Sequence, residues 1–143
     1  MDDQPGLSDQ YRMSSPWPLF VALGFVISEV GVFLNIIPLS VGGLLLFAGS
    51  VAGIIQESGY AERPWGTLSL VGGLLVALGL AITASQVLPF EGFPAALDAV
   101  WGGLVGPELN GVVQRGVSVL FAGVIALVAS QVARLVERDV DAL

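Results

Sequence analysis

The chain has 143 residues, of which 55% are hydrophobic and 12% are charged, and its net charge is −7. A soluble domain carries about twice that charged fraction, and one of this size cannot bury so much apolar surface. Lipid must therefore solvate much of the chain, and the negative charge disfavours nucleic acid as a partner.

The residue inventory also limits the chemistry. The chain has no Cys and no His, and its two Met residues, Met1 and Met13, lie outside the apolar segments. These are the usual ligands for haem, copper and zinc, so we expect no cofactor and no metal to be bound by this chain. Without a Ser–His or Cys–His pair, we also predict no catalytic residues and no enzyme activity of its own.

The hydropathy pattern and the positions of helix-breaking residues predict an all-α membrane protein with four transmembrane helices. A short interfacial helix, which starts near Pro94, is expected between helices three and four. An acidic, disordered tail is predicted for residues 1–15 and a C-terminal tail for 139–143. The domain between them spans 16–138, with helices at about 16–35, 38–56, 65–88 and 112–136.

The cations predict an orientation. All five are Arg, and placing both termini in the cytoplasm leaves only Arg115 outside, as the positive-inside rule favours. Asp98 would then lie on the outer side. An acidic surface without Lys is also typical of a halophilic cytoplasm.

Small residues recur at four-residue spacing, which lets helix backbones approach closely in lipid. Gly and Ala are also simply common in membrane helices, so a single pair such as a GxxxG is weak evidence. The fourth helix carries a longer stripe that favours an interface. The candidate packing residues are Gly49, Gly53, Ser118, Ala122, Ala126 and Ser130.

Glu29 is an acidic residue within the first apolar segment, where an unpaired carboxylate is costly. Counting residues places Arg115 and Gln86 at a similar depth, which predicts a polar cluster of these three side chains near the outer face. Three roles remain open for Glu29: a structural carboxylate paired within the bundle, an anchor to a larger membrane partner, or a proton-coupling group.

Residues 11–65 carry four distinctive strings. They are SPWPLF at 15–20, SEVG at 28–31, GGLLLF at 42–47 and the ESGYAERPW loop at 57–65. This segment resembles the cox cluster proteins of halophilic archaea, which are small membrane proteins encoded beside haem–copper oxidase genes. The resemblance implies a non-catalytic accessory subunit, or an assembly factor, of a terminal oxidase of the respiratory chain in the plasma membrane. The implied partners are membrane lipids and oxidase subunits, and the partner complex would carry the haem and copper.

A second function stays open. A small proton-coupled transporter that works as a homodimer would also have four helices and one glutamate in the first of them. In that case Glu29 would be the coupling carboxylate and would face a substrate cavity. An accessory subunit would instead bury Glu29 against protein.

Overall fold

The structure is a computed structural model that describes residues 14–143. The described part contains five helices and no strand, which confirms the all-α prediction. Most of the segment predicted as an N-terminal tail lies outside the described residues. The helices, in chain order, are α2 (Trp17–Phe33), α3 (Ile37–Glu57), α4 (Trp65–Ser85), α5 (Phe93–Val105) and α6 (Gly111–Asp141).

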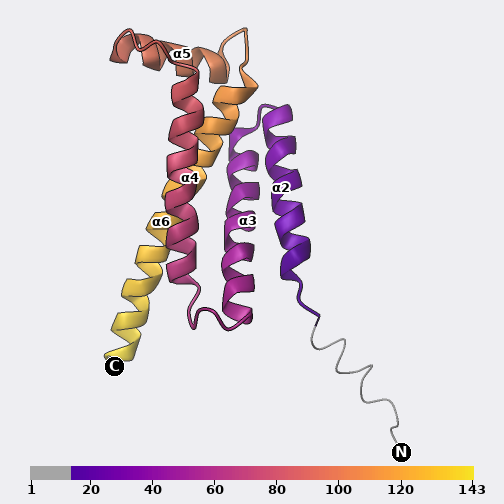
Figure 1. Ribbon diagram of the computed structural model, residues 1–143, viewed down its shortest axis with the longest axis vertical. Coiled ribbons are helices and arrows are strands. Elements are labelled where there is room, and N and C mark those ends of the chain that lie inside the picture. The colour runs from indigo at the N-terminus through magenta and orange to yellow at the C-terminus, as the bar shows by residue number, and fades with distance from the viewer. Residues whose placement is uncertain (1–13) are drawn as a thin grey trace, which may run out of the picture.

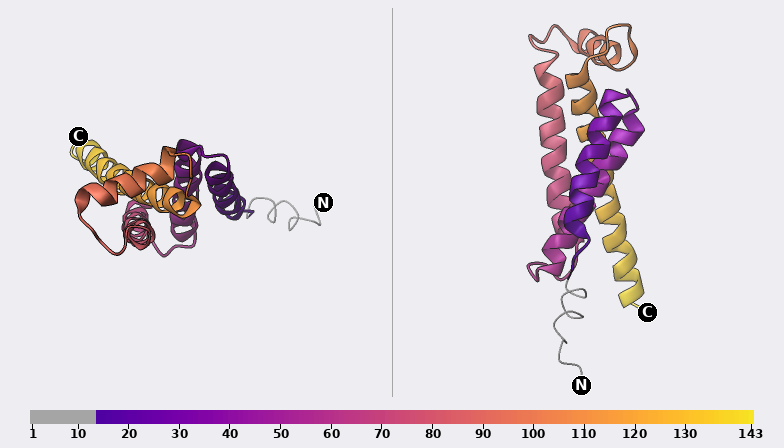
Figure 2. Two further views of the ribbon diagram at one scale, coloured as in Figure 1. Left: turned by 90° about the horizontal axis from the view of Figure 1, so that it is seen from above. Right: turned by 90° about the vertical axis from the view of Figure 1, so that its right-hand side faces the viewer.

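Four of these helices run roughly along one axis, and α5 lies across one end of the bundle (Figure 1). The start of α2, the α3–α4 loop and the end of α6 lie together at the opposite end. We call these two ends the α5 end and the loop end. Figure 2 shows the crosswise position of α5 from two further directions. The most extensive helix contacts pair α2 with α3 and α4 with α6, and α3 joins the two pairs.

Three helices, α3, α4 and α6, are long and apolar enough to cross a membrane. The prediction of four such spans is therefore only partly confirmed, because α2 has 17 residues and falls just short in length. Its shortness has a local cause. Pro16 precedes its first turn, and the chain turns at Asn35, which adopts a positive φ of 56° that Asn tolerates better than most residues.

Two other predicted boundaries were wrong. The last helix continues to Asp141 rather than ending near 136, so most of the predicted tail at 139–143 is helical. Arg63 of the α3–α4 loop contacts this extension, since it lies 3.0 Å from Glu137 and 3.5 Å from Asp141. Helix α4 ends at Ser85, three residues before the predicted end.

Both helix pairs depend on glycines that leave no room for a side chain. A Cβ atom on Gly31 of α2 would overlap the backbone of Ser40 in α3, and a Cβ on Gly79 of α4 would overlap the backbone of Leu120 in α6. Close backbone contact gains dispersion energy where lipid supplies no hydrophobic drive. Between the two pairs, a small core cluster forms from Val41, Ala48, Leu75 and Ala122.

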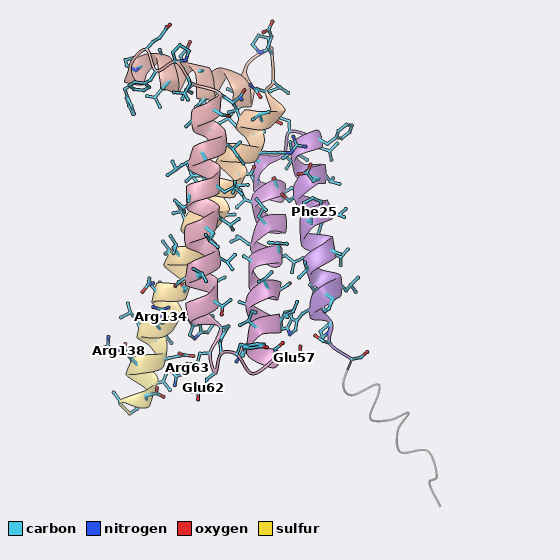
Figure 3. The ribbon with its side chains drawn as sticks, in the orientation of Figure 1. Phe25, Glu57, Glu62, Arg63, Arg134 and Arg138 are labelled. Carbon is cyan, nitrogen blue, oxygen red and sulfur yellow. The ribbon has the colours of Figure 1, made fainter. Side chains whose placement is uncertain are left out.

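Arginines concentrate at the loop end of the bundle. Figure 3 labels Arg63, Arg134 and Arg138 there, together with Glu57 and Glu62. Ser15, just before α2, donates a hydrogen bond of 2.6 Å to Glu57 at the end of α3. The first turn of α2 and the last turn of α3 are therefore at the same level along the bundle.

Candidate functional site

Glu29 and Arg115 form an ion pair between α2 and α6. Arg115 lies in the second turn of α6, and Glu29 lies one turn before the end of α2, so both are near the α5 end. The guanidinium donates from Nε to Oε1 at 3.3 Å and from Nη2 to Oε2 at 2.6 Å. This two-point geometry is the strong form of an Arg–carboxylate contact. Both side chains remain partly exposed, at 40% for Glu29 and 47% for Arg115.

The predicted polar cluster of Glu29, Arg115 and Gln86 is wrong for Gln86. Gln86 lies at the C-terminal end of α4, where its Oε1 accepts a hydrogen bond of 3.0 Å from Nδ2 of Asn110. Asn110 is the N-cap of α6, and its Oδ1 accepts from the amides of Val112 and Val113. The capping position therefore holds Asn110 beside Gln86, and Gln86 takes part in joining α4 to α6 rather than in contacting Glu29.

A second polar link runs parallel to the ion pair. Nε2 of Gln114 donates to Oδ1 of Asn35 at 2.7 Å, and Gln114 is only 3% exposed. This bond ties the α2–α3 turn to the first turn of α6. The sequence does not predict this pair, because the depth of a residue along a helix does not give the direction in which its side chain points.

Two buried serines lie next to the ion pair. The hydroxyls of Ser28 in α2 and Ser40 in α3 are 3.2 Å apart, and the residues are 5% and 0% exposed. The glycine contact at Gly31 brings the two backbones close enough for this bond. Neither serine stood out as a site residue in the sequence, and only the adjacency of Ser28 to Glu29 hinted at it.

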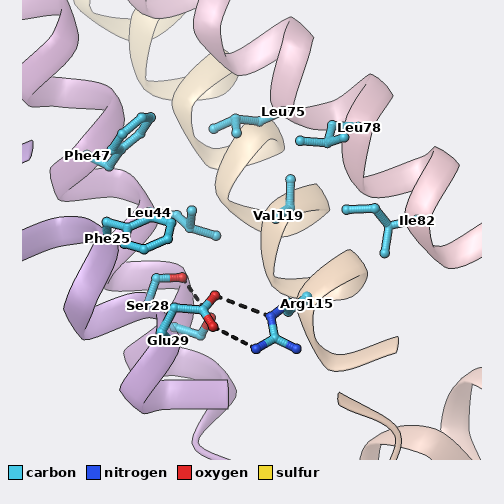
Figure 4. A pocket seen from close by; sticks show the side chains of 11 residues that line it. Phe25, Ser28, Glu29, Leu44, Phe47, Leu75, Leu78, Ile82, Arg115 and Val119 are labelled. Carbon is cyan, nitrogen blue, oxygen red and sulfur yellow. Dashed lines mark hydrogen bonds and ion pairs between the residues drawn. The ribbon is translucent and has the colours of Figure 1, made fainter. Parts of the chain in front are cut away.

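These polar groups border a groove of about 240 Å³ between the α2–α3 pair and the α4–α6 pair. Figure 4 shows the ion pair at one end of the groove and apolar side chains along the rest. Its lining therefore combines a few polar groups with a long apolar wall, as ligand sites commonly do. The apolar lining consists of Phe25, Leu44, Phe47, Leu75, Leu78, Ile82 and Val119.

The predicted packing residues are placed as follows. The α6 stripe of Ser118, Ala122, Ala126 and Ser130 is fully buried within the chain, with exposures of 0–1%. Ser130 hydrogen-bonds Ser69 of α4 at 2.7 Å. The stripe is therefore an interface, as the pattern predicts, and it lies within the chain rather than on a surface open to another protein.

The two glycines of the GxxxG motif in α3, Gly49 and Gly53, have different surroundings. A Cβ on Gly53 would meet the indole of Trp17 at 2.6 Å, whereas nothing lies within 4 Å of a Cβ on Gly49. Trp17 therefore packs on the loop end of α3. Only one of these two glycines is required by a close contact within the chain.

Within residues 14–143, no group of three or more acidic side chains is placed to hold a metal ion. The fold and this site together define a helical membrane protein with an intramolecular ion pair beside an apolar groove. A family model described as "Family of unknown function (DUF7541)" matches residues 1–136. The chain belongs to this family. Comparison with curated proteins and with solved structures gave no match.

Proposed function

We propose that this chain is a non-catalytic accessory subunit, or an assembly factor, of a haem–copper terminal oxidase in the plasma membrane. The partner is inferred from the resemblance of residues 11–65 to cox cluster proteins. The structural observation that supports a non-catalytic role for Glu29 is its ion pair, because Arg115 binds both of its carboxylate oxygens. A paired carboxylate stabilises the bundle, which is the structural role among the three considered.

The proposal includes four crossings of the membrane. Helix α2 is short, but 17 residues lie at the lower limit for a span, and α2 runs antiparallel to α3 along the bundle (Figure 1). The hydrogen bond from Ser15 to Glu57 joins the start of α2 to the end of α3. If α3 crosses the membrane, α2 then crosses it in the opposite direction.

The orientation in the proposal has both termini in the cytoplasm. Arg63, Arg134 and Arg138 gather at the loop end (Figure 3), and Arg115 is near the α5 end. The positive-inside rule places the loop end in the cytoplasm. Helix α5 then lies at the outer surface, where its exposed Leu97 and Trp101 suit the membrane interface.

The test is affinity purification of tagged chain from native membranes in a gentle detergent, followed by an absorption spectrum of the eluate. Bands of a-type or b-type haem are expected from the copurifying oxidase. They would report a partner, because the chain itself has no His or Cys to ligate haem. An unrelated four-span protein with the same tag is the control. A colourless eluate that contains a small homo-oligomer contradicts the proposal.

A second candidate function is a homodimeric proton-coupled transporter, and one observation favours it: Glu29 lines the groove. A coupling carboxylate must exchange protons and substrate, which requires release from Arg115. Glu29→Gln separates the two candidates. An accessory subunit predicts unchanged oxidase turnover per haem in any complex that remains assembled. The transporter predicts that Glu29→Gln abolishes proton-coupled transport by the purified homodimer in vesicles.

A further inference from the structure

The groove between the two helix pairs has a polar end and an apolar end. The polar end holds the ion pair of Glu29 and Arg115, with Ser28 beside it. The apolar wall formed by α4 runs from Ile82 to Leu75, which is roughly 10 Å along the helix toward the middle of the bundle. Figure 4 shows Leu75 and Phe47 at the opposite end of the groove from the ion pair.

This polarity matches that of a lipid in a leaflet. Ile82 lies one turn before the end of α4, so the charged end of the groove is near the membrane surface and the apolar end is near the midplane. A lipid also has its polar group at the surface and its hydrocarbon chain toward the midplane. An amphiphile can therefore enter sideways from the bilayer without turning over.

The mouth of the groove lies on the outer surface of the bundle. Phe25 and Leu78 line the groove and are 59% and 51% exposed on the outer surface of the bundle. A cavity of about 240 Å³ has the volume of roughly eight water molecules in the liquid. That space fits a stretch of one hydrocarbon chain but not a helix from another protein.

The polar end retains hydrogen-bonding capacity. The bonds to Glu29 use Nε and Nη2 of Arg115, so the N–H groups of Nη1 are not engaged by the carboxylate. An oxygen acceptor on a lipid headgroup can take these donors. Because Glu29 balances the charge of Arg115, the site selects for an acceptor oxygen rather than for net charge.

We propose that this groove is a binding site for one hydrocarbon chain of a membrane phospholipid, with a headgroup oxygen bound at Arg115. The bound lipid fills the space between the α2–α3 pair and the α4–α6 pair and packs against both. The inference does not depend on the proposed oxidase role, because the site belongs to the isolated chain and is tested without any partner.

The full chain is reconstituted in phosphatidylglycerol vesicles that contain a trace of phosphatidylglycerol with a diazirine midway along one acyl chain. After irradiation, adducts are mapped by mass spectrometry of peptides. Adducts are expected to concentrate on the groove wall, at Phe47 and Leu75, above the level on outward-facing residues. An even distribution over all lipid-facing surfaces overturns the proposal.

Two variants on α4 provide a matched comparison. Leu78→Trp fills the groove, whereas Leu74→Trp changes a side chain that is 63% exposed and does not line it. Loss of the groove adducts in Leu78→Trp, with retention in Leu74→Trp, supports the proposal. Equal effects of the two substitutions overturn it. Removal of the adducts by an added long-chain quinone, but not by extra unlabelled phospholipid, also overturns the assignment to a phospholipid.

Discussion

Glu29 and Arg115, 86 residues apart in sequence, form a two-point ion pair that is the main polar contact between α2 and α6. Helix contacts between α2 and α6 are otherwise few, and α3 supplies the apolar link between the two helix pairs. The ion pair therefore joins the first helix of the described chain to the last.

The ion pair predicts coupling between its two members. Glu29→Gln and Arg115→Gln should each lower the free energy of unfolding by about 1 kcal/mol, since each leaves one partly exposed charge unpaired near the membrane surface. The double variant should lose clearly less than the sum of the two. Denaturation in detergent micelles, followed by far-ultraviolet circular dichroism, measures the three values. Additive losses would show that the two side chains do not interact.

The glycine contact between α4 and α6 predicts a position-specific effect. Gly79→Ala should destabilise the bundle by about 1–3 kcal/mol, because a Cβ there overlaps the backbone of Leu120. Gly73→Ala is the control on the same helix, since nothing lies within 4 Å of a Cβ at that position. The control should be neutral or slightly stabilising, because Ala favours helix. The same denaturation assay distinguishes them, and equal losses would contradict the α4–α6 contact.

A large substitution in the buried stripe of α6 is expected to destabilise the chain itself rather than to weaken binding to a partner. Ala122→Leu should destabilise the isolated chain by about 3 kcal/mol, because Ala122 is 0% exposed in the central cluster. Ala129→Leu, on an exposed position of the same helix, should change little. Size-exclusion chromatography and denaturation of the purified chain provide the readout. Normal stability of Ala122→Leu, combined with loss of a copurifying partner, would instead show that the stripe binds another protein.

The side-chain contacts of Asn110 predict separable effects on the end of α4 and the start of α6. Asn110→Ala should cost about 0.5–2 kcal/mol through loss of the cap of α6. Asn110→Asp keeps an acceptor for the amides of Val112 and Val113 but removes the donor to Gln86. Hydrogen exchange of residues 85–87 at the end of α4 should rise in both variants, while the start of α6 stays protected only in Asn110→Asp. Unchanged exchange at the end of α4 would show that the Asn110–Gln86 bond does not hold it in place.

Several features followed from the sequence for clear physical reasons. Apolar length and proline positions predict α3 and the start of α4 closely, and residue counting along two helices brought Glu29 and Arg115 to one depth. The position of Gln86 could not be predicted, because Asn110 competes for it through a cap geometry that depends on the turn before α6. The inward rotation of the α6 stripe likewise depends on how four helices pack together, which a pattern of small residues does not specify.

The central structural claim is a four-span bundle with its loop end in the cytoplasm. The chain has no native Cys, so single-cysteine variants at Ser15, Ser58 and Asp98 report accessibility without background. With a membrane-impermeant maleimide, Asp98→Cys should react in intact cells, and Ser15→Cys and Ser58→Cys should react only after lysis. Reaction of Ser15→Cys in intact cells, with Ser58→Cys protected, would show that α2 does not cross the membrane alongside α3 and would contradict the account.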